Sequence, residues 1–411
     1  MPLSFEQKLQ NYAELAVKIG VGLQAGQRLM VRAPIESAPL TRLIVASAYK
    51  AGARLVDVLW TDDAVTLARF NHAPRDSFEE YPTWQAEALT QIAENGDAVL
   101  SIYATDPDLL KDQDPDLVAL VQRVAQTHLA PFRRKVMSDA LNWSLISLPI
   151  ASWAAKIFPE SEPDEQIAQL WEAIFKVCRI DQPDPVTAWQ RHVAELSTRK
   201  DYLNAKAYTA LKYTAPGTDF TLGLPDHHIW HGAHSHTPSG ITFIANIPTE
   251  EVFTMPHKDR AEGVVSSTKP LSYGGVLIED FSLTFANGRV VNVTAKKGEA
   301  VLRKLVGTDE GSARLGEVAL VPHSSPISQS GLLFYNTLFD ENASNHIALG
   351  RAYRFCITGG AAMSDEEFSA AGGNDSLTHV DFMIGSDEMD VAGITRDGQM
   401  EPIMRAGEWT F

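Results

Sequence analysis

Short apolar runs alternate with longer amphipathic stretches through the first 150 residues, and this alternation constrains the fold more than any other feature. The runs lie at residues 28–33, 54–60, 97–103 and 143–150, and helical patterns such as those at residues 5–19 and 38–51 separate them. Strands that are separated by helices usually pair in parallel, because each crossover returns the chain to the same edge of the sheet. The pattern therefore predicts an α/β N-terminal domain with a mostly parallel sheet.

The second half carries different signals. Residues 164–203 have a helical pattern with a proline-bearing break at 181–185 (DQPDP), which is typical of a connector. Beyond it, Asn287-Gly288 and Asp397-Gly398 each stand between two strand-like runs, and such dipeptides favour two-residue hairpin turns with positive φ. We therefore expect an α/β domain with a helical connector over residues 1–200 and a β-rich α+β domain over residues 201–411.

The charge balance bears on the ligands that the chain can attract. Its 52 Asp and Glu residues outnumber its 35 Lys and Arg residues, so 35 − 52 leaves a net charge of −17. A negative chain without a basic run repels the phosphate backbone, and we expect no nucleic-acid partner. A small molecule or a peptide is a more fitting ligand.

The cysteines and the first residues bear on the compartment. Cys178 and Cys356 lie far apart and neither belongs to a CxxC motif, so we expect neither a disulfide framework nor a thiolate metal site. Residues 1–20 lack the order of a signal peptide, and no apolar run has the length of a membrane span. These features predict a cytoplasmic protein without a membrane partner.

A glycine-rich segment, Gly20-Val-Gly22-Leu-Gln-Ala-Gly26, has the composition of a dinucleotide-binding loop but the wrong context. It precedes a predicted strand, whereas a phosphate-binding loop follows its strand and opens a helix whose N–H groups face the anion. We interpret the segment as a helix end and a turn, and expect no nucleotide cofactor.

A histidine-rich segment lies near the start of the second half. Its members are His227, His228, His231, His234 and His236. Imidazole is a common metal ligand, but prolines and a glycine punctuate the segment as they would a polar loop. A loop is the favoured interpretation, and a metal role stays open.

Four segments of the second half place carboxylates and imidazoles in apolar or turn-like surroundings: residues 246–253, 316–321, 340–350 and 378–385. His379 and Asp381 are two residues apart in a strand-like run, so both side chains leave the strand on one face. Glu317 opens the apolar run EVALV, where an ionised carboxylate is costly unless a partner such as a divalent cation neutralises it.

Each of these residues alone has an ordinary explanation. Glu317 could lie at a strand end in solvent or in a salt bridge, Glu250 and Glu251 could begin a helix, and His346 could be an interior histidine. Together they offer hard oxygen ligands and two imidazoles without a thiolate. That set is typical of zinc, cobalt or manganese sites, and the excess of carboxylates suits a pair of ions.

Longer stretches of the chain resemble the thermophilic metalloaminopeptidases, the family that includes aminopeptidase T and aminopeptidase S. The resemblance is carried by NIPTEEVFTMPH, AEGVVSSTKPL, LGEVALV, LFDENASNHIALGRAY and THVDFMIGS, and it extends into the N-terminal half at WSLISLPIASWAAKIFP. It implies a leucyl-type aminopeptidase of broad specificity that uses two divalent ions and acts as a homodimer enclosing its active sites. Residues 201–411 would then be the metal-binding catalytic domain.

The resemblance also implies roles for single residues. The implied metal ligands are Glu251, Glu317, His346, His379 and Asp381, with Glu317 shared by both ions. In the mechanism that we expect, the ions activate a water, Glu250 moves its proton to the leaving amine, and Tyr353 donates a hydrogen bond to the oxyanion.

Two other functions are open on the sequence alone. A two-metal phosphoesterase would use the same ligands together with basic residues, and Lys258 and Arg260 lie close behind Glu251. A ligand-binding module with a structural metal is the second, although structural zinc sites are usually rich in cysteine. Assays on leucyl-p-nitroanilide and p-nitrophenyl phosphate would distinguish a phosphoesterase from a peptidase. Metal stoichiometry measured together with turnover would distinguish a structural metal from a catalytic one.

Overall fold

The computed structural model describes residues 3–104, 106, 108–274 and 276–411 of the chain. The chain divides into two compact units, one formed by Met1–His192 with His234–Pro248 and the other by Val193–Ala233 with Thr249–Phe411. The predicted division at residue 200 falls inside helix α8 (Pro185–Lys206), which crosses from one unit to the other. None of the helices within the described ranges combines the length and apolar character that a membrane span requires.

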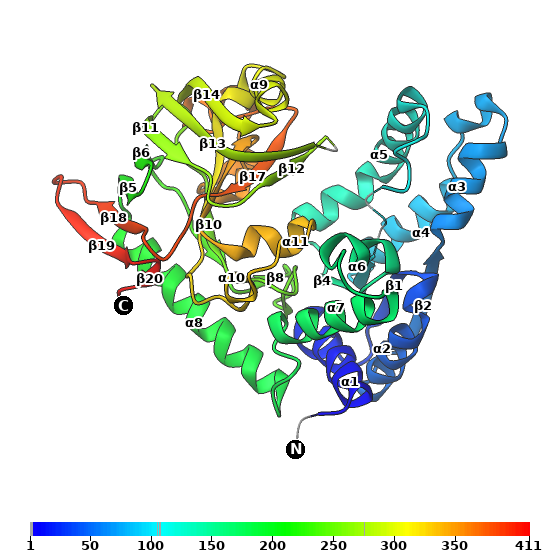
Figure 1. Cartoon of the computed structure of the whole chain (residues 1–411). Helices are drawn as coiled ribbons and strands as arrows, with labels where there is room; N and C mark the ends of the chain where they lie inside the picture. Colours follow the sequence, from blue (N-terminus) through cyan, green and yellow to red (C-terminus); the bar gives the residue numbers. More distant parts are fainter. Residues whose placement is uncertain (1–2, 105, 107, 275) are drawn as a thin grey trace. The chain divides into compact units, whose positions relative to one another are not determined.

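The first unit is built on a four-stranded parallel sheet in the order β2-β1-β3-β4 (Figure 1). Its strands are β1 (Arg28–Pro34), β2 (Leu55–Thr61), β3 (Ala98–Tyr103) and β4 (Trp143–Ser147), with a short ribbon of β8 (Ser235–His236) and β9 (Thr242–Phe243). Its helices are α1 (Phe5–Leu15) with a π-helical turn (Ala16–Gly20), α2 (Ala38–Lys50), α3 (Asp63–His72), α4 (Thr83–Glu94), α5 (Pro115–Met137), α6 (Ala151–Ile157), α7 (Pro163–Val177) and the start of α8. The predicted α/β domain with a parallel sheet is confirmed.

The glycine-rich segment forms the predicted helix end and turn. Gly20 is the last residue of the π-helical turn, and Gly22 and Gly26 have φ angles of 54° and 83° before β1 begins at Arg28. Glycine adopts these left-handed conformations without steric cost. The segment therefore leads into a strand and does not open a helix.

The second unit consists mainly of two antiparallel sheets (Figure 1). A nine-stranded sheet has the order β12-β13-β11-β6-β5-β18-β19-β20, with β14 pairing β13, and a five-stranded sheet has the order β17-β16-β15-β10-β7. The larger sheet contains β5 (Ala210–Ala215), β6 (Thr218–Gly223), β11 (Ala261–Ser266), β12 (Leu271–Tyr273), β13 (Val276–Ala286), β14 (Arg289–Lys297), β18 (Asp390–Ile394), β19 (Met400–Arg405) and β20 (Glu408–Trp409). The smaller contains β7 (His231–Gly232), β10 (Val252–Thr254), β15 (Leu315–Leu320), β16 (His346–Gly350) and β17 (His379–Met383), and the helices are α9 (Glu299–Val306), α10 (Pro326–Ser330), α11 (Thr337–Asp340) and α12 (Asp365–Ala370).

The two predicted hairpins form, but only one has a two-residue loop. Asn287 and Gly288 link β13 to β14 with φ angles of 49° and 75°, as a type I′ turn requires. The strands flanking Asp397-Gly398 end at Ile394 and begin again at Met400, so this loop is longer than predicted. Thr395 closes it, because its N–H donates to the Gln399 carbonyl at 2.9 Å and its hydroxyl accepts from the Gln399 N–H at 3.0 Å.

The five-stranded sheet has two chemically different faces. One face contributes Val252, Val318, Leu320, Ile347, Leu349 and Phe382 to the hydrophobic core that it shares with the nine-stranded sheet. Phe382 packs on Phe281 of β13 with ring centroids 5.3 Å apart. Because strand side chains alternate, the residues between these apolar ones emerge on the opposite face. That opposite face carries the carboxylates and imidazoles described next.

Candidate metal centre

Four neighbouring strands bring the five predicted ligands to one face of the sheet. The side chains come from the residue before β10 (Glu251), from β15 (Glu317), from β16 (His346) and from β17 (His379 and Asp381). Each is one residue away from a core residue of its own strand, so the alternation of the strands sends all five away from the core.

Small residues between the ligands keep this face open. His346 lies opposite Ala319, and Ala348 lies between Glu317 on one side and Asp381 on the other. Gly350 lies opposite His379 with a φ of 110°, and a Cβ there would come within 2.1 Å of the Thr378 carbonyl oxygen. Ligand atoms can therefore converge over short side chains.

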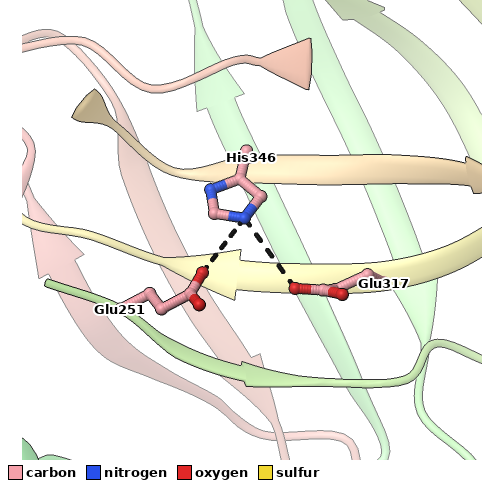
Figure 2. A group of neighbouring side chains, drawn as sticks. All are labelled: Glu251, Glu317 and His346. Atoms are coloured by element: carbon pink, nitrogen blue, oxygen red, sulfur yellow. Dashed lines mark ion pairs between the residues drawn. The ribbon is translucent and has the colours of Figure 1, made fainter. Parts of the chain in front are cut away.

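The first group of ligands consists of Glu251, Glu317 and His346, whose ligand atoms all lie within 4.8 Å of one another. Figure 2 shows the His346 ring directed between the two carboxylates. Its Nε2 lies 3.2 Å from Glu251 Oε2 and 3.8 Å from Glu317 Oε1. All three side chains are almost enclosed.

The second group consists of Glu317, His379 and Asp381, and it meets the same 4.8 Å limit. His379 Nε2 lies 3.4 Å from Glu317 Oε2 and 3.4 Å from Asp381 Oδ1. Glu317 therefore belongs to both groups, and its two oxygens face different imidazoles.

Backbone carbonyls orient both imidazoles. His379 Nδ1 lies 2.7 Å from the Arg351 carbonyl oxygen, and His346 Nδ1 lies 3.2 Å from the Ser344 carbonyl oxygen. A carbonyl only accepts, so each Nδ1 carries the proton that it donates. Nε2 is then left to face the carboxylates, which is the usual arrangement around metal-ligating histidines.

The carboxylates of the metal-free site favour positive charge on the groups beside them. Burial alone would lower the pKa of both histidines, but the carboxylates prevail: they raise the pKa of His379 to about 11 and that of His346 well above its usual range. Burial also raises the pKa of Glu251, against the lowering effect of His346. Protons thus supply in the metal-free chain the charge that cations would supply.

A divalent cation fits this donor set. Apart from the imidazole Nε2 atoms at 3.2 Å and 3.4 Å, the buried oxygens Glu251 Oε2 and Asp381 Oδ1 have no polar partner among the described residues. Leaving such oxygens unsatisfied is costly in a folded protein. Hard carboxylate oxygens with imidazole nitrogens are the donors that zinc, cobalt and manganese accept.

Tyr353 lies beside the second group. Its ring centroid is 4.9 Å from that of His379. Burial raises the pKa of its hydroxyl, and the charges of Glu317 and Asp381 raise it further. The hydroxyl therefore stays protonated and remains able to donate a hydrogen bond.

Glu250 is enclosed next to the first group but belongs to neither group of ligand atoms. It is 2% exposed, and its N–H donates to Asn342 Oδ1 at 2.7 Å. Adjacent residues of an extended chain point to opposite sides, so the backbone that turns Glu251 towards the ligands tends to turn Glu250 away from them.

Glu341 is a further acidic residue at the site, and the sequence reasoning did not single it out. It opens a 3₁₀ turn (Glu341–Ala343) directly after α11. Burial raises its pKa well above the usual range, and the charges of Glu251 and Asp381 add to that effect. Its presence in the DENASNH segment was visible in the sequence, but no strand or helix periodicity indicates where a residue in such a turn points.

The basic residues that kept a phosphoesterase open make other contacts. Lys258 Nζ donates to Ser369 Oγ, and the Arg260 guanidinium donates to the Thr209 carbonyl. Neither contact involves a ligand of the two groups. Lys258 and Arg260 therefore no longer favour a phosphoesterase.

The histidine-rich segment contributes to neither group of ligand atoms found among the described residues. His228 Nδ1 hydrogen-bonds the Pro225 carbonyl at 2.8 Å, and His231 Nε2 hydrogen-bonds the Phe355 carbonyl at 2.9 Å. The segment is nevertheless not a loop throughout, because His231 lies in β7 and His236 lies in β8.

Comparison with known proteins agrees with the geometry. Residues 5–409 match the family described as "Thermophilic metalloprotease (M29)". The chain is 53% identical to aminopeptidase 2 of Geobacillus stearothermophilus (99% of this chain, 98% of that protein) and 52% identical to aminopeptidase AmpS of Bacillus subtilis (99% and 100%). The solved structure of wild-type AmpT from Thermus thermophilus superposes with a TM-score of 0.92 at 41% identity, over 99% of this chain and 100% of that one.

Proposed function

The chain belongs to the M29 family of thermophilic metalloproteases, and on that basis we propose that it is a two-metal aminopeptidase that releases N-terminal residues from peptides. The metallo-aminopeptidase class follows from the family. The two ions, their ligands and a broad specificity are the parts that we add.

The observation that supports two ions is the position of Glu317. It is 6% exposed, and its two carboxylate oxygens face His346 and His379 separately. Glu251, Glu317, Asp381 and Glu341 bring four carboxylates to the site, which two divalent cations would balance. When bound, such ions acidify a shared water and polarise the carbonyl of the scissile bond.

The chain's own residues have defined tasks in this proposal. Glu251 and His346 would hold one ion, His379 and Asp381 would hold the other, and Glu317 would contribute to both. Tyr353 keeps its hydroxyl proton and donates a hydrogen bond to the oxygen of the attacked carbonyl, a contact that is typically worth about 2.7–4 kcal/mol. A carboxylate carries the proton from water to the leaving amine, and both Glu250 and Glu341 are candidates.

The Glu317→Gln variant tests the proposal. Gln keeps the shape of the side chain but removes the charge, so we expect a folded protein that loses both ions and its hydrolysis of leucyl-p-nitroanilide. Metal content by mass spectrometry and folding by circular dichroism accompany the assay. Exposed Glu388→Gln is the matched control and should keep both ions. If Glu317→Gln keeps its metal and cleaves at the parent rate, the shared-ligand assignment is wrong.

The native metal is part of the same test. Zinc, cobalt and manganese all accept these donors, and availability selects among them in cells. We expect the metal-free protein to regain activity with each of the three, at different rates. Hydrolysis that survives complete removal of metal would contradict the proposal.

We also propose that the protein is a cytoplasmic homodimer. Support comes from the first unit, where β2 is an edge strand with Leu55 39% and Trp60 41% exposed and where α3 buries no side chain. Exposed apolar edges of this kind are usually covered. Sedimentation should give twice the 45.1 kDa chain mass, and Trp60→Lys should shift the distribution towards the monomer. A parent protein that sediments as a monomer at all concentrations would exclude the dimer.

A further inference from the structure

The His379 imidazole is oriented by a carbonyl that lies outside both groups of ligand atoms. Its Nδ1 donates to the Arg351 carbonyl oxygen at 2.7 Å, and its Nε2 faces the carboxylates of the second group. Arg351 directly follows Gly350, the last residue of β16, so this carbonyl belongs to a segment that has left the strand. The direction of the ring therefore depends on what holds residues 350–353 in place.

Asn374 holds this segment at two points. Its side-chain Nδ2 donates to the Gly350 carbonyl oxygen at 2.6 Å, and its backbone carbonyl accepts from the Ala352 N–H at 2.8 Å. Gly350 and Ala352 are the two neighbours of Arg351 in the chain. One residue therefore binds the peptide groups on both sides of Arg351.

Peptide planarity turns one of these contacts into a constraint on the His379 ring. The Ala352 N–H and the Arg351 carbonyl belong to the same planar peptide group, and in a trans peptide they point in opposite directions. While the Asn374 carbonyl holds the N–H, the Arg351 oxygen is directed the other way, where His379 Nδ1 donates to it. Rotation of this peptide group would break both contacts together.

Asn374 has a fixed position of its own. It is 3% exposed, and its Nδ2 also donates to the Gly311 carbonyl oxygen at 2.8 Å. Further along the same loop, the Asp309 carboxylate accepts from the Ser376 hydroxyl at 2.8 Å and from the Leu377 N–H at 2.6 Å. The loop before β17 is thus a fixed support for the segment after β16.

We propose that Asn374 is a positioning residue for the second ion, because it holds the peptide group that directs the His379 imidazole. This inference rests on the proposed function, in which His379 and Asp381 would hold that ion. The His346 imidazole of the first group is oriented separately, by the Ser344 carbonyl oxygen. Loss of the Asn374 side chain should therefore weaken the binding of one ion and leave the other unchanged.

The Asn374→Ala variant of the full chain, titrated with cobalt from the metal-free state, tests the proposal. Alanine removes both Nδ2 contacts, so the backbone carbonyl that holds the Ala352 N–H is no longer anchored. Contacts that orient a ligating histidine typically change metal affinity about 10–100-fold. We expect one cobalt ion to bind as in the parent and the other to bind about 10–100-fold more weakly. Equilibrium dialysis and the visible absorption of bound cobalt measure both steps without relying on turnover.

Two double variants identify the ion that Asn374→Ala still binds. Adding Asp381→Asn should leave this ion in place, because Asp381 belongs only to the second group. Adding Glu251→Gln should remove it, because Glu251 belongs only to the first group.

A matched control comes from another asparagine of the second unit. The Asn204 side chain also makes two backbone hydrogen bonds, donating to the Trp230 carbonyl at 3.0 Å and accepting from the Trp230 N–H at 2.8 Å. Asn204→Ala should bind both cobalt ions as the parent does. If Asn374→Ala does not fold, Asp309→Asn replaces it: the amide keeps the shape but has one acceptor oxygen where the loop uses two, so the second ion should again be the weaker one.

The outcomes that overturn the proposal differ from those that overturn the proposed function. Equal weakening of both ions would assign Asn374 a purely structural role, and unchanged binding of both would show that His379 is directed without it. A remaining ion that is lost with Asp381→Asn would also contradict the proposal. In each case the parent still binds two ions, whereas a parent that binds only one at saturating cobalt would contradict the two-metal enzyme itself.

Discussion

Protonation governs the candidate metal centre at the scale of single residues. His379, with its pKa raised to about 11, and His346, with its pKa well above the usual range, are both charged at neutral pH when no ion is bound. A metal ligand must be the neutral imidazole, so an ion and a proton compete for each Nε2. The carboxylates that attract the cation also make the imidazoles bind protons more tightly.

This competition predicts proton release. Titrating the metal-free protein with zinc at pH 7 should release about two protons per chain, one from each imidazole, as measured by calorimetry in buffers of different ionisation enthalpy. The apparent affinity should rise from pH 7 to pH 9, because the displaced protons then enter a solution of lower proton activity. Without metal, the raised pKa of His379 stabilises the fold fully below its ordinary value of 6.5, and this contribution is lost as the pH rises towards about 11.

A histidine outside the site provides the control for this titration. His236→Gln, in the first unit, should release the same number of protons as the parent. A release close to zero in the parent would show that the imidazoles are neutral before metal binds, and the raised pKa values would then be wrong.

The proton carrier can be found by comparing two buried glutamates. Burial and the neighbouring charges of Glu251 and Asp381 raise the pKa of Glu341 well above its usual range in the metal-free chain. We expect Glu341→Gln to lower kcat by about 10²–10⁴-fold while the protein keeps both ions. Glu250→Gln should have a smaller effect, because Glu250 belongs to neither ligand group. A larger loss at Glu250 would restore the assignment made from the sequence.

At the scale of elements, the pairing of β15 with β16 sets the position of Glu317, the proposed shared ligand. The register of the two strands shifts between Leu315 and Glu317, and Gly316 lies at the shift. A Cβ on Gly316 would come within 2.2 Å of the Arg351 carbonyl oxygen and 2.4 Å of the Gly350 carbonyl oxygen. Because these are backbone atoms, only movement of a strand would make room.

The Gly316→Ala variant should therefore disturb the strand pair. We expect a loss of about 1–3 kcal/mol in the free energy of unfolding and a lower metal content, measured by denaturant titration and mass spectrometry. Gly307→Ala is the control, since Gly307 has a φ of −95° and the atom nearest to a Cβ there would be the Arg303 carbonyl oxygen at 3.2 Å. Equal stability of the two variants would mean that β15 tolerates a side chain at this position.

At the scale of the whole molecule, all five proposed ligands belong to the second unit. Metal binding should therefore stabilise that unit directly, because an ion that binds only the folded state adds to its stability. The first unit contributes no ligand to the two groups of ligand atoms found in the described residues.

Hydrogen exchange can test this difference between the units. On removal of metal by a chelator, we expect faster amide exchange in β10, β15, β16 and β17, because these strands then lose the stabilisation that bound ions add to the folded state. Strands β1 to β4 of the first unit should exchange at an unchanged rate. Similar acceleration in both units would show that the metal stabilises the chain as a whole.

Local patterns in the sequence were sufficient for the architecture of the first unit. β1 begins at Arg28 and β3 ends at Tyr103, as the apolar runs predict, because each strand and each helix is marked by its own periodicity. The Asn287-Gly288 turn was predictable for the same reason, since its two residues alone determine the φ angles. The Asp397-Gly398 loop was not, because Thr395, two residues upstream, closes it with its backbone and its hydroxyl.

By itself, the sequence determined the chemistry of the candidate site: the residue types of the five proposed ligands, and for His379 and Asp381 a shared face. Only the tertiary structure decided that β10, β15, β16 and β17 are neighbours, because antiparallel pairing across long connections has no local signature. The tertiary structure also places Glu317 between the two imidazoles and His231 beside Phe355. It positions Glu341 at the site from a 3₁₀ turn. Side-chain periodicity specifies a face of a strand, whereas the neighbours of that face depend on how the whole core packs.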